Sequence, residues 1–254
     1  MDRALNGAWR ALGAELARWR ETGCAADFWW RDDDAARAVP ALERLLALAA
    51  RSRTPLALAV IPHQAEPALF DTLPAAVCVI QHGADHRNRA ATGEKKTEFP
   101  AHEAPAEALA RLAGARKRLA GLAAQRMLAV LAPPWNRISA ALVPQLAGAG
   151  FRGLSGYGAR AAAFAAPGLR QVNAHVDIVD WRGAGGFVGE EAALGAACAH
   201  LAARRAGRAD AAEPTGILTH HARHDEAAWA FLERFFEFTR AAGARWLGAE
   251  ELFA

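Results

Sequence analysis

The chain has 254 residues, of which 53% are hydrophobic and 22% charged, and this composition excludes an intrinsically disordered protein. Its length is that of one α/β-barrel domain, so we expect a single domain over residues 1–254. The net charge of +3 comes from scattered arginines and not from a basic stripe interleaved with aromatic side chains. This distribution argues against a nucleic-acid-binding protein.

The predicted elements alternate between strand and helix. Short apolar runs bounded by Pro, Gly or charge predict buried strands at 27–31, 55–61, 76–81 and 128–131, with further strands at 151–155, 170–179 and 215–219. Apolar spacings of three and four predict helices at about 3–20, 38–52, 104–125, 139–149, 190–206 and 224–241. This order predicts an α/β fold with a parallel sheet or barrel inside a layer of helices.

Two stretches interrupt the alternation and predict loops, at 87–105 and 182–189. The second is rich in glycine but lacks the spacing of a phosphate-binding loop. We therefore interpret it as a turn.

Membrane insertion and secretion find no support in the sequence. No stretch approaches about 18 uninterrupted apolar residues, so no membrane-spanning helix is expected. The first 21 residues mix charged and apolar side chains, unlike a secretory signal. Cys24, Cys78 and Cys198 fit neither a disulfide framework nor a thiolate zinc site, because they are odd in number and far apart. These features predict a cytoplasmic protein.

Unusual polar residues follow four of the predicted strands, at residues 31–34, 82–86, 133–137 and 219–221. The active sites of α/β barrels lie at the carboxyl ends of the strands. We therefore expect these four segments to meet at one mouth of the barrel.

A divalent metal ion explains the first two segments together. Asp32, Asp33 and Asp34 repel one another unless a cation compensates them. His82 and His86 are four residues apart, a spacing that places both imidazoles on one side of a helical turn. Two histidines and one carboxylate leave coordination positions open, as in a catalytic site, for zinc first and for other first-row metals such as Co, Ni or Mn as alternatives.

Each piece taken alone has a simpler interpretation. A pair of histidines four apart is more often a surface or helix-packing pair, and an acidic triplet is more often a helix N-cap with solvated neighbours. His220 and His221 fit one core residue and one solvated residue. Their joint occurrence at strand ends favours the metal site.

These motifs, in this order from about residue 27 to residue 240, resemble the polysaccharide deacetylase (NodB-homology) carbohydrate esterases. That family has an Asp-Asp pair after the first strand, then HxxxH, RxPxG-like, Asp-and-Trp and Leu-x-His motifs. The resemblance implies a distorted (β/α) barrel of about seven parallel strands with outer helices, and a divergent branch of the family.

The resemblance also implies roles for residues of this chain. Asp34, His82 and His86 would hold the metal, and Asp33 would be the general base that deprotonates the attacking water. A shift of one residue would give these roles to Asp32 and Asp33 instead. His220 would be the general acid.

Two further motifs complete the expected site. Asp177 would orient His220, with Asp180 as the competing carboxylate. The pocket for the substrate is expected to include the following residues: Pro134, Trp135, Asn136, Trp181 and His221. Trp30 is either part of the same wall or a plain core side chain.

The third motif departs from the family pattern. The five residues from Ala132 to Asn136 stand in place of RxPxG, so the arginine that would pair with the catalytic base is absent. Arg31 or Arg137 would substitute, because a guanidinium near Asp33 keeps that carboxylate ionised. The stretch 81–99 is interpreted as a substrate loop of this branch.

The predicted function is that of a metal-dependent hydrolase that removes an acyl group, typically acetyl, from an amide nitrogen of a sugar-like small molecule or oligosaccharide. One alternative is a metal amidohydrolase of a small non-carbohydrate amide. The other is a binding protein of the same fold without catalysis, which the altered third motif favours and the retained Asp33 and His220 oppose.

Overall fold

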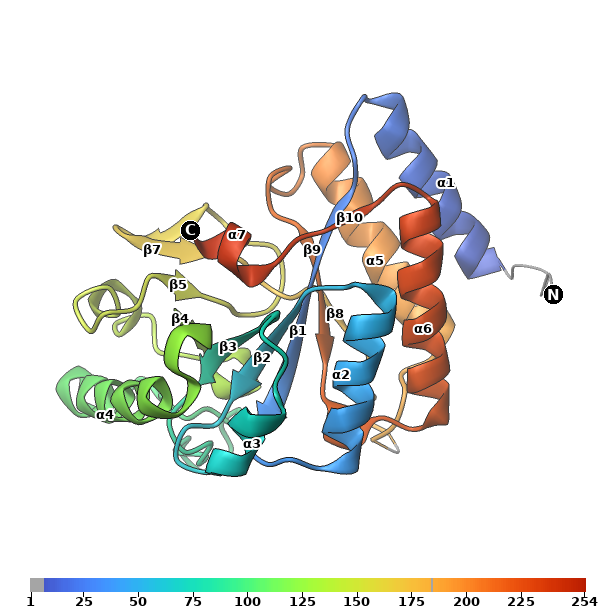
Figure 1. Ribbon diagram of the computed structural model, residues 1–254. Helices are drawn as coiled ribbons and strands as arrows, with labels where there is room; N and C mark the ends of the chain where they lie inside the picture. The colour runs from blue at the N-terminus through green and yellow to red at the C-terminus, as the bar shows by residue number, and fades with distance from the viewer. Residues whose placement is uncertain (1–6, 184) are drawn as a thin grey trace.

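The computed structural model describes residues 7–183 and 185–254, with helices arranged around a mostly parallel sheet (Figure 1). The helices are α1 (Gly7–Glu21), α2 (Pro40–Ser52), α3 (Pro67–Thr72), α4 (Pro105–Ala123), α5 (Glu190–Arg205), α6 (Glu226–Ala241) and α7 (Ala249–Phe253). The strands are β1 (Asp27–Ala35), β2 (Leu56–Val60), β3 (Val77–His82), β4 (Met127–Ala132), β5 (Gly153–Leu154), β6 (Phe164–Ala166), β7 (Leu169–Gln171), β8 (Val176–Asp177), β9 (Thr215–Thr219) and β10 (Arg245–Trp246).

Local sequence signals determine where several helices begin. Pro40, Pro67 and Pro105 each occupy the first turn of a helix, where the missing N–H costs nothing and the fixed φ suits the helix. Asp225 caps α6, since its carboxylate accepts the backbone N–H of Ala228 at 2.8 Å.

The sheet runs in the order β6-β7-β5-β4-β3-β2-β1-β9-β8, and only β6 is antiparallel to its neighbour. The segment 169–177 closes this sheet into a barrel. Its first part, β7, pairs with β5, a bridge joins Tyr157 to Ala174, and its last part, β8, pairs with β9. The barrel thus has seven parallel strand positions, formed by β1 to β5, by the segment 169–177 and by β9. This confirms the expected distorted barrel.

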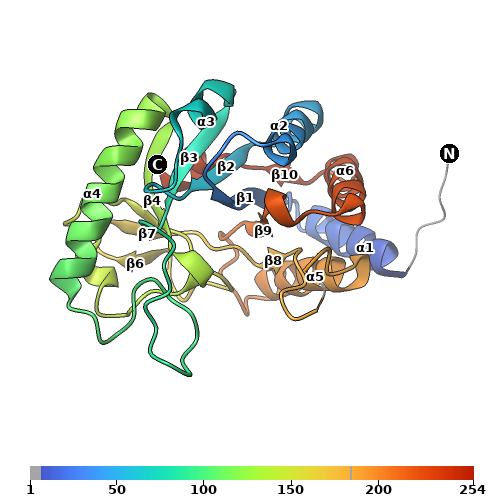
Figure 2. The same cartoon turned by 90° about the horizontal axis from the view of Figure 1, so that it is seen from below.

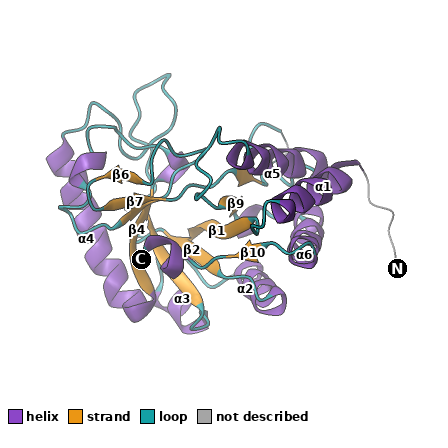
Figure 3. Ribbon diagram, turned by 90° about the horizontal axis from the view of Figure 1, so that it is seen from above, coloured by secondary structure: helices purple, strands orange, loops and turns teal. Residues whose placement is uncertain are grey.

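The helices cover the barrel on the outside. Helices α1, α2, α5 and α6 lie on one side and α3 and α4 on the other (Figures 1 and 2). Helix α7 lies across the end of the barrel that is viewed in Figure 3, where Leu252 and Phe253 pack against Trp29 and Val130 from the strands. The opposite end, formed by the carboxyl ends of the strands, is viewed in Figure 2.

The alternation of side chains along β1 decides what reaches this end. Phe28 and Trp30 belong to the core between barrel and helices, whereas Trp29 lies in the barrel interior. Arg31 and Asp33 continue the inward series.

The expected strands all appear, with 170–179 divided between β7 and β8. The expected helix at 139–149 is wrong. This stretch forms turns and a short 3-10 helix at Val143–Gln145, because Pro144 lacks an N–H and Gly150 adopts a left-handed φ of 88°. The expected helix at 3–20 begins among residues outside the described ranges and continues as α1. Four of the described helices and strands lacked a sequence signal of sufficient length: α3, β6, β10 and α7.

No helix of residues 7–183 and 185–254 is both long enough and apolar enough to cross a membrane.

Candidate active site

Each of the three adjacent aspartates at the end of β1 has different partners. Asp32 lies beside His221, whose Nδ1 is 2.5 Å from Asp32 Oδ1. Asp33 meets Arg31, and Asp34 meets His82 and His86. The left-handed φ of Asp34, 69°, turns its side chain away from the alternation of the strand. The repulsion expected within the triplet is therefore relieved by four cationic or imidazole groups, with different groups beside each aspartate.

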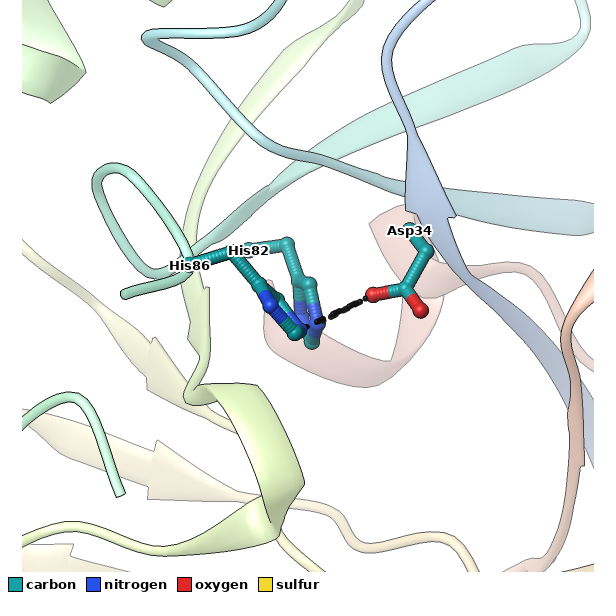
Figure 4. A group of neighbouring side chains, drawn as sticks. All are labelled: Asp34, His82 and His86. Atoms are coloured by element: carbon teal, nitrogen blue, oxygen red, sulfur yellow. Dashed lines mark ion pairs between the residues drawn. The ribbon is translucent and has the colours of Figure 1, made fainter. Parts of the chain in front are cut away.

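Asp34 and the two histidines converge on one point (Figure 4). Asp34 Oδ1 lies 3.1 Å from His82 Nε2 and 3.1 Å from His86 Nε2. The donor atoms of all three residues lie within 4.8 Å of one another. Burial by itself would raise the pKa of Asp34, but the two imidazoles outweigh it and hold that pKa far below its usual range.

The turn between the two histidines is not the helical turn that the spacing predicted. His82 ends β3, and His86 follows a bend in which Gly83 and His86 both have left-handed φ values, of 60° and 58°. A side chain at residue 83 would be impossible, since its Cβ would lie 2.1 Å from Glu98 Oε2 and 2.6 Å from Pro134.

The Glu98 side chain holds this turn through hydrogen bonds to its backbone. Its fully buried carboxylate accepts backbone N–H groups from Ala84 at 2.9 Å, Asp85 at 3.2 Å and His86 at 3.1 Å. Burial raises the pKa of Glu98. The stretch 81–99, expected to be a substrate loop, thus contains the residue that fixes His86.

Arg31 clamps Asp33 inside the barrel. Its second terminal nitrogen donates to Asp33 Oδ2 at 3.0 Å, and its Nε lies 2.9 Å from Oδ1 as an ion pair without the alignment of a hydrogen bond. Arg31 also donates to Asn136 Oδ1 at 2.5 Å and to Ser155 Oγ at 2.6 Å. Sequence reasoning missed Ser155, although a polar residue at the end of a predicted strand was a signal available for it.

Arg137, the other candidate for this pairing, lies elsewhere. It is exposed, and its guanidinium donates to the backbone carbonyl of Lys96 at 3.0 Å.

His220 approaches the site from the end of β9, and its contact with the Asp-and-Trp motif is indirect. Asp177 Oδ2 accepts the indole N–H of Trp181 at 2.7 Å, and the Trp181 ring meets His220 edge-on at 4.8 Å between centroids. His220 Nδ1 is buried and has no hydrogen-bond partner within the described residues. Burial raises the pKa of Asp177. Asp180, the competing carboxylate, accepts the backbone N–H groups of the following turn, at residues 182 and 183.

The expected substrate-pocket residues fall into two groups. Trp135 lies 4.4 Å from the His86 ring, in a left-handed conformation with φ 56°, and Trp181 is exposed. His221, in contrast, is buried against Asp32, so that neither of the paired histidines is solvated.

Trp30 is a core residue, which decides between its two interpretations. It is 1% exposed, packs against Phe236 with a centroid distance of 4.7 Å and donates to Thr219 Oγ1 at 2.8 Å. Its place in the alternation of β1 directs it outward, toward α6.

No protein-family model matches the sequence, and no curated protein is significantly similar to it in sequence. Solved structures are similar. A family 4 carbohydrate esterase from Streptomyces lividans, in complex with acetate, shares 15% identity and a TM-score of 0.53, over 87% of this chain and 90% of that one. The chain has the fold of the family 4 carbohydrate esterases.

Two other esterases of this family give the same result. A Streptococcus mutans esterase shares 13% identity and a TM-score of 0.57, over 91% of this chain and 89% of that one. A family 4 acetyl xylan esterase from Clostridium thermocellum, in complex with a cobalt ion, shares 13% identity and a TM-score of 0.55, over 89% and 90%. The low identities agree with a divergent branch, and they bear out the resemblance at the level of the fold.

The residues present fit a metal ion. Two imidazole nitrogens and one carboxylate oxygen, all electron-pair donors when deprotonated, point at a common centre. Such an arrangement requires a cation or shared protons to offset the repulsion of the lone pairs, and it matches the nitrogen and oxygen donors of a catalytic zinc site.

Proposed function

We propose that this protein is a metal-dependent hydrolase that removes an acyl group, typically acetyl, from an amide nitrogen of a sugar or sugar-like substrate. Asp34, His82 and His86 would hold one divalent ion, zinc foremost, with Co, Ni and Mn as alternatives. The observation that carries the proposal is the convergence of these three donors next to the Arg31–Asp33 pair, at the carboxyl ends of the strands.

A bound divalent ion would supply Lewis acidity, which lowers the pKa of a coordinated water and polarises a carbonyl. The chain itself supplies the proton transfers. Asp33 would accept a proton from the attacking water, since it lies one residue from Asp34 and its carboxylate faces the barrel interior. Arg31 holds the Asp33 carboxylate in position through two contacts. Arg31 thereby takes the part expected of the arginine absent from the third motif.

His220 would donate a proton to the departing nitrogen, so that the C–N bond breaks to give a carboxylic acid and an amine. Its buried Nδ1 and the edge-on contact with Trp181 fix its ring, and Asp177 fixes Trp181 in turn. We propose that Asp177 orients His220 through Trp181 and not by a direct hydrogen bond.

The aromatic side chains suit a ring-shaped substrate. Trp135 packs beside His86 and Trp181 beside His220, so that one indole flanks the metal ligands and the other the general acid. A sugar face stacks on such side chains through its C–H groups. Pro134 and Asn136 complete this wall.

The test is metal content together with amide hydrolysis. Purified protein, loaded with zinc or cobalt, is expected to retain about one ion per chain and to release acetate from N-acetylglucosamine oligomers. His82→Ala combined with His86→Ala should abolish both. His102→Ala, which removes an exposed histidine outside the cluster, serves as the control. Retention of one ion by the double variant would refute the proposal.

A further inference from the structure

A groove of about 800 Å³ lies beside the site, between the end of β4 and the β6–β7 hairpin. Its walls are mostly apolar, and they include the following side chains: Ile138, Val143, Ala161, Ala162, Phe164 and Ala165. Of the residues that line it, only Asn136 has a part in the function proposed above.

The inner end of the groove adjoins the candidate catalytic base. Asn136 and Gly156 both line it, and both accept hydrogen bonds from Arg31, at 2.5 and 3.3 Å. The same guanidinium clamps Asp33. Only the Arg31 side chain therefore separates the inner end of the groove from Asp33.

Exposed aromatic side chains gather around the same place. Three large hydrophobic side chains are exposed among the described residues: Tyr157 at 49%, Phe164 at 52% and Trp181 at 53%. Tyr157 and Phe164 line the groove, and Trp181 flanks His220. Exposed apolar surface concentrated next to a reactive centre indicates a ligand that covers it.

The polar side chains of the groove are already engaged within the protein. Asn173 bonds the backbone at Gly156 and Gly158 through its two amide atoms, at 2.8 Å each. Tyr157 donates its hydroxyl to the carbonyl of His175 at 3.0 Å, and Arg137 donates to Lys96. A sugar chain would therefore find few polar side chains in the groove that are not already hydrogen-bonded within the protein, whereas a hydrocarbon chain needs none.

We propose that this groove binds a hydrocarbon chain of the substrate, attached close to the scissile amide, so that the substrate is amphiphilic. This inference rests on the proposed function and adds the substrate class. Each methylene that leaves water for such a groove strengthens binding by up to about fourfold, which favours an alkyl chain of several carbons over a short acyl or alkyl group.

The chain can belong to either side of the amide, and two substrate series distinguish these sources. The first series is N-acetyl, N-butanoyl and N-octanoyl glucosamine, in which the acyl group lengthens. The second is methyl, butyl and octyl glycosides of N-acetylglucosamine, in which the amine product lengthens. In one of the series kcat/KM should rise about tenfold or more from the shortest to the longest member, at concentrations below micelle formation.

A matched pair of variants locates the effect. Ala162→Glu places a charge on the wall of the groove, whereas Ala230→Glu places the same charge on an exposed position of α6, on the other side of the barrel. Ala162→Glu should reduce the preference for the octyl or octanoyl compound at least about fivefold, and Ala230→Glu should leave it unchanged.

The outcomes separate this inference from the proposed function. Hydrolysis of the short compounds without any rise in either series would overturn the groove assignment and leave the hydrolase proposal standing. Absence of hydrolysis throughout would count against the hydrolase, and calorimetric binding of octyl glucoside, weakened by Ala162→Glu and not by Ala230→Glu, would then support the groove alone. Octyl glucoside binding that is equal in the parent and in both variants would sink the groove assignment in either case.

Discussion

Two clusters, each made of two histidines and one carboxylate, lie at opposite ends of the barrel. Asp34, His82 and His86 form the carboxyl-end cluster, at the carboxyl ends of the strands, and His175, His200 and Glu213 form the amino-end cluster, at the start of β9. In both, the donor atoms lie within 4.8 Å of one another. Donor type and spacing alone do not distinguish them.

Hydrogen bonding distinguishes them. In the amino-end cluster, His175 Nδ1 accepts the backbone N–H of Gly216 at 2.9 Å, so that Nε2 carries the proton. This Nε2 lies 3.3 Å from Glu213 without the alignment of a hydrogen bond. Glu213 also accepts backbone N–H groups from Arg160 and Asn173. A lone pair already used for such a bond is not available to a metal ion.

Ring geometry adds a second difference. His175 and His200 stack face to face, with centroids 3.5 Å apart and an angle of 16°, so their nitrogens point in parallel directions. His82 and His86 are tilted by 36° and both direct Nε2 to one oxygen of Asp34. We conclude that the amino-end cluster is a hydrogen-bonded structural unit and that, of the two, only the carboxyl-end cluster suits a metal ion.

The largest expected difference is in metal content. Asp34→Ala should reduce the bound metal from about one ion per chain to none and abolish turnover, since it removes the oxygen that faces both imidazoles. Glu213→Gln should keep about one ion, although it destabilises the fold by about 1–3 kcal/mol through a weakened buried network. Elemental analysis after dialysis, combined with urea unfolding, measures both. Loss of the ion from the Glu213 variant, in a folded protein, would break the comparison.

Turnover without a change in metal content separates the base from the ligands. Asp33→Asn should retain the ion and lower kcat by about 10²–10⁴, because the amide cannot accept a proton from water. Acetate release and metal content are measured on the same sample. Equal loss of metal in Asp33→Asn and Asp34→Ala would instead assign the two residues to one role.

Loss of the Glu98 carboxylate, which holds the turn of the carboxyl-end cluster, should have a smaller effect on metal binding. Glu98→Gln replaces one accepting oxygen by an amide NH₂ directed at backbone N–H groups, which loosens the turn that carries His86. We expect metal affinity to fall about 10- to 100-fold, measured by competition with a chelator. Glu94→Gln changes an exposed glutamate of the same loop and is the control. Unchanged affinity in Glu98→Gln would show that the turn holds itself.

The smallest expected effect is a pH dependence of the free energy of unfolding that arises in the amino-end cluster. Burial, followed by the charges of His175 and Arg204, lowers the pKa of His200 from 6.5 to about 3. Because the folded state favours the neutral ring, its contribution to stability is complete above pH 6.5 and is lost as the pH falls toward 3.

His200→Phe should keep the stacked ring and remove this titration. Between pH 7 and pH 5 the parent should lose roughly 2 kcal/mol more of its free energy of unfolding than the variant does. Urea unfolding at the two pH values measures it. Parallel losses in the two proteins would show that His200 does not titrate in this range.

The sequence predicted most of the barrel because its strands are buried on both faces and appear as dense apolar runs, as at residues 55–61 and 76–81. It failed where a single residue overrides the local pattern. Pro144 prevents the helix expected at 139–149, and the left-handed Gly83 and His86 replace the helical turn that the spacing of the two histidines suggested. Short elements such as α3 and α7 depend on tertiary packing, and their few residues show no periodicity that would predict them.

The sequence by itself determined the donor types and their order along the chain: a carboxylate triplet, two histidines four apart and a histidine after the last long strand. The tertiary structure decided the partners. Three adjacent aspartates are indistinguishable in sequence, yet the alternation of β1 and the left-handed Asp34 send them to His221, to Arg31 and to the two imidazoles. Hydrogen bonds that depend on contacts between distant segments, such as that from Gly216 to His175, likewise decide which of two equal donor sets has lone pairs to offer.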